Sequence, residues 1–385
     1  MLHLAAGWAH RFGVGLRVAT VDHGLRPESA AEARLVADEA QGLGVPHDVL
    51  HWRDQPTGNL QDAARRARYR LLSEWLAGSR HLLVAHTADD QAETLLMRLA
   101  RGSGVDGLSA MRPMTRRDGM VLVRPLLGER RAALRNHAKT LNIPIVDDPS
   151  NEDDHYGRVR LRRLIGQEGL DVDTLGATAR RMARAQEALS VRALSIARTV
   201  LGNAGQGTDV VMIDRDPFAQ IESETQMRIL AATLQASSGA GYRSREAALE
   251  AGLQTLLDGG TVTLHGAMAV ARGKWIFVGR EPKAVAERAV PTGEKSVWDK
   301  RWRLDTRNIA DAEIRALGPE GAQQLRDAGA NLPQNPPLPA VFWHAQPAIW
   351  RANHLLAFGS ARFGLEYGIQ SPDTCGICFS HLKPH

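Results

Sequence analysis

Cysteine is nearly absent from this chain of 385 residues. Only Cys375 and Cys378 occur, and both lie close to the end of the chain. A disulfide scaffold is therefore excluded, and the scarcity of thiols favours a reducing compartment, the cytoplasm. Two residues separate the Cys375-x-x-Cys378 pair from His381, whereas a zinc finger needs about a dozen between its ligand pairs. We therefore expect an irregular, unstructured tail rather than a structural metal.

Long apolar runs are also absent. No stretch approaches the ~20 residues of a membrane-spanning helix, so we expect no membrane association. Residues 1–10 are apolar but lack the basic leader and cleavage site of a signal peptide. Hydrophobic residues make up 43% of the chain and charged residues 24%, as in ordinary soluble proteins. A net charge of +5 permits a polyanionic partner without requiring one.

The N-terminal part of the sequence alternates between helical and strand patterns. We expect helices over 1–12, 28–43, 59–77 and 90–99, and strands over 16–21, 47–52 and 82–85. This alternation predicts an α/β fold with a doubly wound parallel sheet. The pattern begins on a helix, although a βαβ unit needs a strand before its first helix. We therefore expect the first, central strand of the sheet to be missing from this sequence.

An acidic motif, H-x-x-D-D-x-x-E-T, follows the apolar run at 82–85. His86, Asp89, Asp90 and Glu93 are spaced by three or four residues, so most of them share one face of a helix. Carboxylates this close repel each other unless the site binds a cation, either a metal or an amine. Ligands bind at this edge of an α/β sheet, so we predict an active site. In the alternative interpretation, the acidic residues only complement the helix dipole.

Three further segments surround this motif. Residues 102–107 match G-x-G-x-x-G, but a helix precedes them where a dinucleotide fingerprint requires a strand. We interpret this segment, which contains Gly102 and Gly104, as a flexible loop beside the acidic site. The strand expected over 121–126 carries Arg124 to the same edge, a helix over 129–141 follows, and then a strand over 143–146. An acidic turn at 147–151 precedes arginines suited to gripping phosphate, or to a solvated helix start: Arg158, Arg160, Arg162 and Arg163.

The remaining sequence divides the chain into three expected regions: a catalytic domain over 1–166, a helical α+β domain over 167–284, and a small irregular C-terminal region over 285–385. In the second region we expect helices over 171–201, 221–236 and 247–257, and a hairpin formed by 261–270 and 275–278. The first of these helices carries Arg180, Arg181 and Arg184. These arginines either contact nucleic acid or lie on a helix that packs against its neighbours.

Several linked motifs resemble those of the bacterial tRNA(Ile)-lysidine synthases, a family of the PP-loop ATPase superfamily with an adenine nucleotide alpha-hydrolase-like fold. They are VDHGLRPES at 21–29, N-x-Q at 59–61, AR-x-x-RY at 64–69, HTADDQAETLLMRLARGSGVDGL at 86–108, RPLL at 124–127 and DPSNEDDHYGRVRLR at 148–162. The resemblance is strong over about 15–165, weaker over the helical region and faint beyond Glu281.

The resemblance implies a chemistry. Such enzymes use ATP, with Mg²⁺, to adenylate the C2 oxygen of the wobble cytidine in an isoleucine tRNA with a CAU anticodon, and L-lysine then displaces AMP. By motif match, Asp90 and Glu93 hold lysine, with Asp89 nearby for lysine or the metal. His86, Arg124 and Arg158 stabilise phosphates or developing charge, and Asp22, His23, Gly102 and Gly104 contact the nucleotide. The resemblance implies that Arg160, Arg162, Arg163, Arg180, Arg181 and Arg184 grip the tRNA. The chain is also compatible with a homodimer.

One departure from the family is severe, because the S-G-G-x-D-S pyrophosphate loop is absent from this sequence. We attribute this to a start assigned too late or a truncated gene, and we expect weak ATP binding by the chain as it stands. Three alternatives remain open: a tRNA-binding remnant without catalysis, a related PP-loop tRNA thiolase, and a metal-dependent hydrolase built on the acidic motif. The thiolase is disfavoured because no cysteine precedes Cys375.

Overall fold

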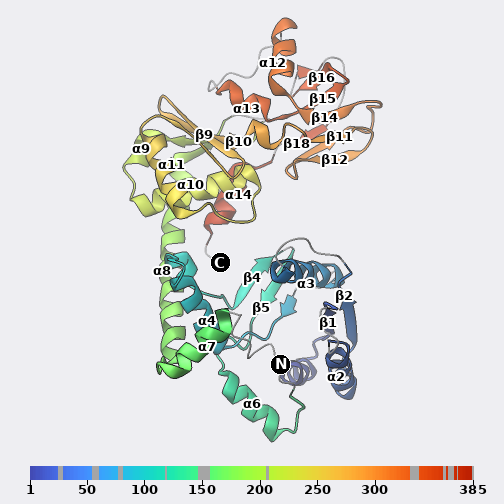
Figure 1. The fold of residues 1–385 in the computed structure, drawn as a ribbon. Helices are drawn as coiled ribbons and strands as arrows, with labels where there is room; N and C mark the ends of the chain where they lie inside the picture. Colours follow the sequence, from blue (N-terminus) through green and yellow to red (C-terminus); the bar gives the residue numbers. More distant parts are fainter. Residues whose placement is uncertain are drawn as a thin grey trace. The chain divides into compact units, whose positions relative to one another are not determined.

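A computed structural model of the chain describes residues 1–24, 29–53, 60–76, 81–117, 119–145, 157–204, 208–329, 338–358, 361–362, 368–370 and 372–383 (Figure 1). The chain forms two compact units, unit 1 from Met1 to Gln186 and unit 2 from Glu187 to Pro384. The three regions expected from the sequence, with boundaries at 166 and 284, stay a prediction.

The strands of unit 1 form two sheets. β1 (Val18–Asp22) pairs with β2 (His47–His51) in parallel. The second sheet has the order β3-β5-β4, in which β3 (His81–Leu83) is parallel to β5 (Met120–Val123), and β4 (Met114–Arg117) is antiparallel to β5. This α/β arrangement differs from the single parallel sheet that we expected. A connection as short as residues 118–119 allows only an antiparallel pair, and no described strand joins the two sheets.

The helices of unit 1 largely follow the expected pattern. They are α1 (Leu2–Phe12), α2 (Ser29–Gly42), α3 (Leu60–Leu76), α4 (Ala88–Leu99), α5 (Val105–Leu108), α6 (Arg131–Thr140), α7 (Gly157–Gln167) and α8 (Val172–Val200), the last of which continues into unit 2. α5 was not expected, and the expected strand at 143–146 is not a strand over its described residues.

α3 contacts both sheets of unit 1. It packs against β1, and its Tyr69 and Leu76 form a buried cluster with Met120 and Leu122 of β5. Near its end, the Trp75 indole N–H donates a hydrogen bond of 2.9 Å to Asp48 Oδ2 on β2. α3 therefore holds the β1–β2 sheet and the β3-β5-β4 sheet together, although no described backbone pairing connects them.

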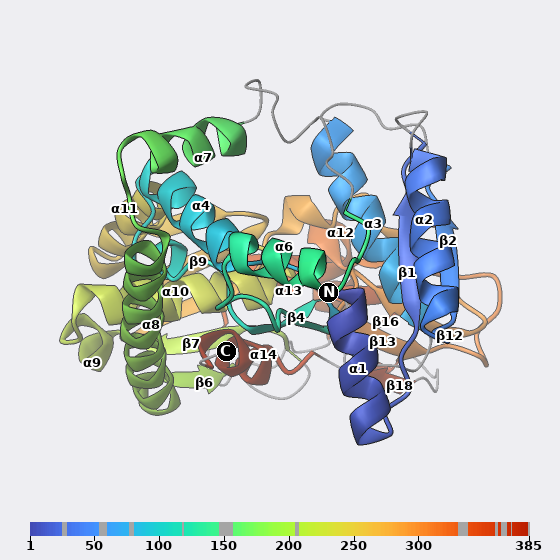
Figure 2. The same cartoon turned by 90° about the horizontal axis from the view of Figure 1, so that it is seen from below.

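α4 is the most enclosed helix around the acidic motif. Its Ala88 and Ala92 pack with Val172 and with Ile165 of α7, while Leu95 packs with Ala110 and Ala179. Figures 1 and 2 both show α4 and α7 side by side. This apolar contact brings Arg162 of α7 to Glu93 of α4.

Unit 2 is built on a five-stranded antiparallel sheet of order β6-β7-β10-β9-β8. Its strands are β6 (Leu201–Asn203), β7 (Val211–Asp214), β8 (Thr261–Leu264), β9 (Ala267–Arg272) and β10 (Trp275–Arg280). α10 (Ser223–Ser238) is buried along nearly its whole length, and α9 (Arg215–Ala219) and α11 (Glu246–Leu257) complete this layer. The hairpin expected from 261–270 and 275–278 is present as β9 and β10, but residues 261–270 contain two strands, β8 and β9.

The region after residue 281, which we expected to be irregular, is mostly regular structure. Two further sheets have the orders β11-β14-β15-β16-β17 and β12-β13-β18. Their strands are β11 (Ala289–Pro291), β12 (Lys295–Trp298), β13 (Trp302–Asp305), β14 (Glu313–Ala316), β15 (Pro347–Arg351), β16 (His354–Phe358), β17 (Ala361–Arg362) and β18 (Gly368–Gln370). A short 3₁₀ turn (Pro282–Ala284), α12 (Gly318–Asp327) and α13 (Ala340–His344) accompany them.

The prediction of an unstructured C-terminal tail is also wrong. Residues Thr374–Leu382 form α14, which packs against α10, and Cys378 and Leu382 belong to the main hydrophobic core of unit 2. Both cysteines are free and buried. Burial raises the pKa of the Cys375 thiol to about 11 and raises the pKa of Cys378 further. The three-residue spacing of the cysteines places both on the buried face of α14.

A buried ion network joins three segments of unit 2. Arg280 on β10 donates two hydrogen bonds to the Asp299 carboxylate, at 2.9 and 3.1 Å. Arg301 donates to Asp299 at 3.0 and 3.1 Å and to Asp209 at 2.8 Å. The side chain of Asp299 is 1% exposed, that of Arg280 7% and that of Arg301 5%. The network therefore compensates charges that water does not reach.

None of the described helices has the length and apolar character needed to cross a membrane.

Candidate active site

The acidic motif lies at the start of α4, immediately after β3. Thr87 is the N-cap residue, and both its backbone N–H and its hydroxyl donate hydrogen bonds of 2.8 Å to Asp90 Oδ2. An acidic side chain at the third helical position is a common partner of such a cap. The helix cap therefore occupies one oxygen of Asp90, and Oδ1 remains for other contacts.

Asp89 connects the start of α4 to the start of α6. Its Oδ2 accepts a hydrogen bond of 2.7 Å from the backbone N–H of Arg131, and the Ala88 N–H donates to the Glu129 carbonyl at 2.9 Å. The N-terminal ends of two helices, α4 and α6, therefore lie beside Asp89. Among the described residues, no group of three acidic, histidine or cysteine side chains is placed to hold a metal ion. The expected metal role of Asp89 stays a prediction.

Glu93 is the most deeply buried carboxylate of the motif, with 1% of its side chain exposed. Its Oε1 accepts a hydrogen bond of 2.9 Å from Arg162 Nε on α7, and Arg131 Nη2 lies 3.8 Å from the same oxygen. Its Oε2 is also buried and has no hydrogen-bond partner among the described residues. A buried acceptor without a donor costs about 1–3 kcal/mol, so this oxygen is suited to receive a donor from a ligand.

The formal charges around Glu93 do not balance. Asp90 and Glu93 face two guanidinium groups, because Arg131 Nη2 lies 3.3 Å from Asp90 Oδ1 and 3.8 Å from Glu93 Oε1 and Arg162 Nε donates to Glu93 Oε1. The third carboxylate, Asp89, accepts the backbone N–H of Arg131, which carries no formal charge. One negative charge is in excess within this set, which we call the carboxylate cluster. Buried charges are normally paired, so the cluster is suited to one further monovalent cation. The structure also places Arg162 in this cluster, and its expected contact with tRNA stays a prediction.

Asp22 and His23 lie where β1 ends. Asp22 Oδ1 accepts hydrogen bonds from the Gly24 N–H at 2.9 Å and from the Ser29 hydroxyl at 2.7 Å. These bonds hold the pKa of Asp22 below its usual range. His23 Nε2 lies 3.0 Å from Arg68 Nη2, and burial, together with the Arg68 charge, lowers the pKa of His23. The Nδ1 atom of His23 is buried without a partner in the described residues.

Arg124 follows β5, which is parallel to β3, so it lies at the same sheet edge as His86. Its Nη1 donates to the Arg112 carbonyl at 2.8 Å and to the Thr115 hydroxyl at 3.1 Å. Its Nε is buried without a partner in the part of the chain that the structure describes, and burial lowers the pKa of this arginine. A buried guanidinium with an unused donor is suited to bind an anionic oxygen.

We expected Gly102 and Gly104 to lie beside the acidic site, but the structure places them away from the carboxylate cluster. They follow the C-terminal end of α4, roughly 18 Å along the helix from Asp89. There, Arg98 donates to the carbonyls of Gly107 and Ala110 and holds this loop against α4. The nucleotide-binding role of the two glycines stays a prediction.

The other candidate arginines lie on two helices. Arg160 and Arg163 are exposed on α7, and Arg180, Arg181 and Arg184 are exposed on α8. The side chain of Arg158 and the acidic turn at 147–151 lie outside the described residues. The tRNA contacts expected for these arginines stay predictions.

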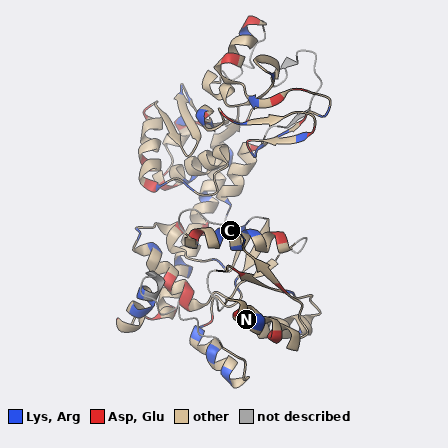
Figure 3. Ribbon diagram, turned by 45° about the vertical axis from the view of Figure 1, so that its right-hand side comes forward, with Lys and Arg blue, Asp and Glu red and all other residues tan. Residues whose placement is uncertain are grey.

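Arg131 is the residue of the cluster that our sequence analysis missed. It begins α6, a helix whose basic residues Arg131, Arg135 and Lys139 recur every four positions; blue bands mark such residues in Figure 3. A signal was available, because α6 follows β5 after a short connection and therefore begins at the sheet edge that carries the acidic motif. The sequence alone does not show which of Arg130 and Arg131 faces that edge.

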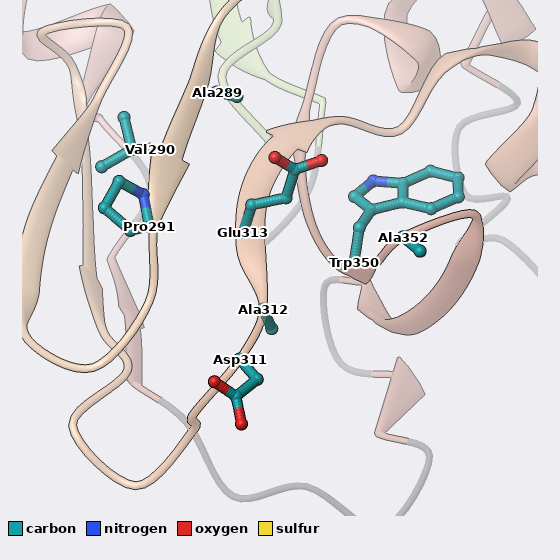
Figure 4. A pocket seen from close by; sticks show the side chains of 8 residues that line it. All are labelled: Ala289, Val290, Pro291, Asp311, Ala312, Glu313, Trp350 and Ala352. Carbon is teal, nitrogen blue, oxygen red and sulfur yellow. The ribbon is translucent and has the colours of Figure 1, made fainter.

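A cavity of about 460 Å³ lies in unit 2, and none of the site residues expected from the sequence lines it. Figure 4 shows the carboxyl groups of Asp311 and Glu313 and the indole of Trp350 around it. The remaining lining residues are Ala289, Val290, Pro291, Ala312 and Ala352. The cavity lacks the basic side chains that a phosphate ligand requires, so we do not assign it to the nucleotide.

Comparisons with known proteins agree with the geometry. The PP-loop domain family matches residues 1–169. A tRNA(Ile)-lysidine synthase from Ruegeria pomeroyi is 42% identical over 363 residues, which cover 93% of this chain and 84% of that protein. One from Rhodopseudomonas palustris is 41% identical over 292 residues, which cover 69% of this chain and 84% of that protein.

Among solved structures, a U34-tRNA thiolase, NcsA, from Methanococcus maripaludis with its 4Fe–4S cluster is 13% identical. The similarity covers 47% of this chain and 66% of that one with a TM-score of 0.40, too low to support an argument. The family assignment depends instead on the curated relatives and on the PP-loop match. This chain belongs to the tRNA(Ile)-lysidine synthase family.

Proposed function

We propose that this chain ligates lysine to C2 of the wobble cytidine in the AUA-reading isoleucine tRNA, which carries a CAU anticodon, and so forms lysidine. Family membership supports the class of reaction, a ligation on tRNA by a PP-loop enzyme. One observation carries the assignment of the site: Glu93 is buried, and its Oε2 has no donor among the described residues. A lysine amine supplies the missing donor and the missing positive charge.

ATP supplies the activation, because transfer of AMP to the C2 oxygen of cytidine makes that carbon open to attack by an amine. The structure offers donors for the phosphates, since Arg124 Nε and His23 Nδ1 are buried without described partners. Arg124 and His86 lie at the sheet edge where α4 begins. We assign to them, and to Arg158, the stabilisation of negative charge that develops on the phosphates and the leaving AMP.

The carboxylate cluster has two roles toward lysine in this proposal. Glu93 Oε2 and Asp90 Oδ1 bind the ammonium group, and their burial excludes water that would compete for it. The amine must lose a proton before it attacks, and one of these carboxylates accepts that proton. AMP then leaves as the new carbon–nitrogen bond forms. Asp89 positions Arg131 through its backbone N–H.

A resident Mg²⁺ ion does not fit the carboxylate cluster as it stands. Magnesium prefers octahedral coordination by oxygen, but Asp89 Oδ2 already accepts a backbone N–H and Glu93 Oε1 accepts an arginine. We therefore derive no step through a metal at this position. Mg²⁺ bound to the ATP phosphates stays a prediction.

The exposed arginines of α7 and α8 are the candidates for tRNA binding: Arg160, Arg163, Arg180, Arg181 and Arg184. Arginine on an exposed helix face contacts the phosphate backbone and positions an RNA without reading its sequence. A cytoplasmic location and a homodimer stay predictions.

Incorporation of radiolabelled lysine into an isoleucine tRNA transcript, with ATP and Mg²⁺, tests the proposal. We expect Glu93→Gln to lower incorporation at limiting lysine by at least ~30-fold, because loss of one partner of a buried charged pair costs about 2–5 kcal/mol. Glu168→Gln, which changes an exposed glutamate on the helix end that follows α7, is the matched control and should leave the rate unchanged. Equal rates for the two variants would refute the lysine assignment.

A second candidate function, tRNA binding without ligase activity, is favoured by the sheets of unit 1. No described strand connects β1 to β3, and the sequence has no S-G-G-x-D-S loop. Separate titrations with tRNA and with ATP distinguish the two candidates: tRNA binding without ATP binding supports the second. The thiolase alternative is disfavoured because both cysteines are buried and their pKa values are raised.

A further inference from the structure

Closely spaced carboxylates attract divalent cations as well as amines, yet the proposed reaction needs a monovalent amine at the carboxylate cluster. Any enzyme that uses ATP also works in the presence of free Mg²⁺. We propose that Arg131 is a specificity-determining residue that makes the carboxylate cluster accept one ammonium group and exclude a divalent cation. This inference rests on the proposed function only where it names lysine as the amine.

The backbone and the side chain of Arg131 have separate contacts. Its backbone N–H donates to Asp89 Oδ2 at 2.7 Å and fixes the start of α6. Its guanidinium Nη2 lies 3.3 Å from Asp90 Oδ1 and 3.8 Å from Glu93 Oε1. The side chain can therefore be changed while the helix start and the Asp89 contact remain in place.

The guanidinium acts mainly through its charge. Its distances to Asp90 and Glu93 are longer than the 2.7–2.9 Å typical of strong charged hydrogen bonds. It nevertheless lies between the two carboxylates that a metal ion would have to bridge. A divalent ion entering there would face a positive charge a few ångströms away in a partly buried site, where water screens the repulsion less than in bulk solvent.

The count of charges and acceptors leads to the same conclusion. With Arg131 and Arg162 present, the cluster has one negative charge in excess, and a single ammonium neutralises it. A divalent ion would overcompensate this charge, and it would find few open oxygens because N–H groups occupy Asp89 Oδ2, Asp90 Oδ2 and Glu93 Oε1. Without the Arg131 side chain, the excess is two negative charges and Asp90 Oδ1 is released for a metal.

Binding of Mn²⁺, followed by electron paramagnetic resonance, tests this inference on the full chain without requiring catalysis. The variants are Arg131→Met and Arg131→Gln, which remove the charge, and Arg131→Lys, which keeps it. Arg130→Met is the matched control, because the neighbouring Arg130 pairs instead with Asp171 and Asp173, at 3.6 and 3.1 Å. Circular dichroism checks that each variant folds. Two charge-removing variants are used so that the test can still be made if one of them does not fold.

We expect Arg131→Met and Arg131→Gln each to bind one Mn²⁺ ion with at least ~10-fold higher affinity than the three other proteins. Those three are the unmodified chain, Arg131→Lys and Arg130→Met. Mg²⁺ should displace that Mn²⁺. Titration calorimetry with lysine supplies the second measurement. Without divalent ions, Arg131→Met and Arg131→Gln should bind lysine several-fold more tightly than the unmodified chain. Added Mg²⁺ should reverse this gain in affinity in those two variants alone.

Equal Mn²⁺ affinity in all five proteins would overturn the inference, as would a gain that Arg131→Lys shares. If no protein binds lysine but the neutral variants acquire the Mn²⁺ site, the role of Arg131 stands and the proposed substrate fails. If lysine binds every protein equally and Mn²⁺ binds none, the substrate assignment stands and the role of Arg131 fails.

Discussion

Asp299 is the carboxylate whose replacement should destabilise unit 2 most clearly. Asp299→Asn keeps the size of the side chain and removes its charge. The residue has a φ of 49°, a left-handed conformation that asparagine adopts more readily than other side chains. The substitution therefore adds little backbone strain, and its effect reports the loss of charge compensation.

The magnitude follows from what remains around Asp299 after the change. Arg280 keeps its hydrogen bonds to two carbonyl oxygens, those of Ser238 at 3.0 Å and Gly266 at 2.9 Å, but loses its anion. Arg301 keeps Asp209 at 2.8 Å, and Arg288, whose Nη1 lies 2.9 Å from Asp299 Oδ1, is 42% exposed, so water replaces its anion. Loss of one partner of a buried ion pair costs about 3–5 kcal/mol, and because one arginine retains an anion we expect the low end, ~3 kcal/mol. In a unit of this size that lowers the melting temperature by roughly 6–12 °C.

Differential scanning calorimetry of the full chain measures this shift, and near-ultraviolet circular dichroism assigns it to unit 2 because Trp298 and Trp302 flank the network. Asp305→Asn is the control, since Asp305 pairs with an arginine whose side chain is 63% exposed. Such a surface pair contributes about 0–1 kcal/mol. If the two variants shift the transition by the same amount, the reasoning about buried charge compensation is refuted.

Two further predictions concern the surface of α8 and the buried thiols. Replacement of Arg180, Arg181 and Arg184 by glutamine should weaken tRNA binding and reduce the slope of log affinity against log salt by about 1 per lost phosphate contact. The control Arg307→Gln should change neither the affinity nor the slope. Filter binding at several salt concentrations measures both quantities. Cys375, with a pKa raised to about 11 by burial, should react with iodoacetamide only slowly at pH 8, at a rate that rises with pH toward 11, and quickly once urea unfolds the chain.

Much of unit 1 could be predicted from the sequence because its signals are local. The helices α1 to α4 begin and end within a few residues of the expected positions, since apolar periodicity and capping residues act over one or two turns. The acidic motif was expected on the first turns of a helix after a strand, and it lies there, although β3 is only partly buried. The buried Oε2 of Glu93 was not predictable, because it depends on how α7 packs against α4.

The failures concern contacts between distant parts of the sequence. Arg131 lies 41 residues from Asp90, so nothing in its own neighbourhood shows that its side chain reaches the acidic motif. The strands after residue 281 are short, and several are paired with strands far away in sequence, as β13 is with β18. α14 was missed for a related reason, since Cys378 is buried by residues of α10. Local propensity is a weak guide where such tertiary contacts decide the structure.

The position of α14 also has a consequence for the order in which unit 2 folds. The strands β8, β9 and β10 are joined by short turns, so their pairing closes small loops and can form early. α14 instead docks on α10, a helix that precedes it by more than a hundred residues. Closing so large a loop is entropically expensive and slow. The apolar surface of α10 that α14 covers therefore stays exposed until late in folding, which makes this stage the one most prone to aggregation.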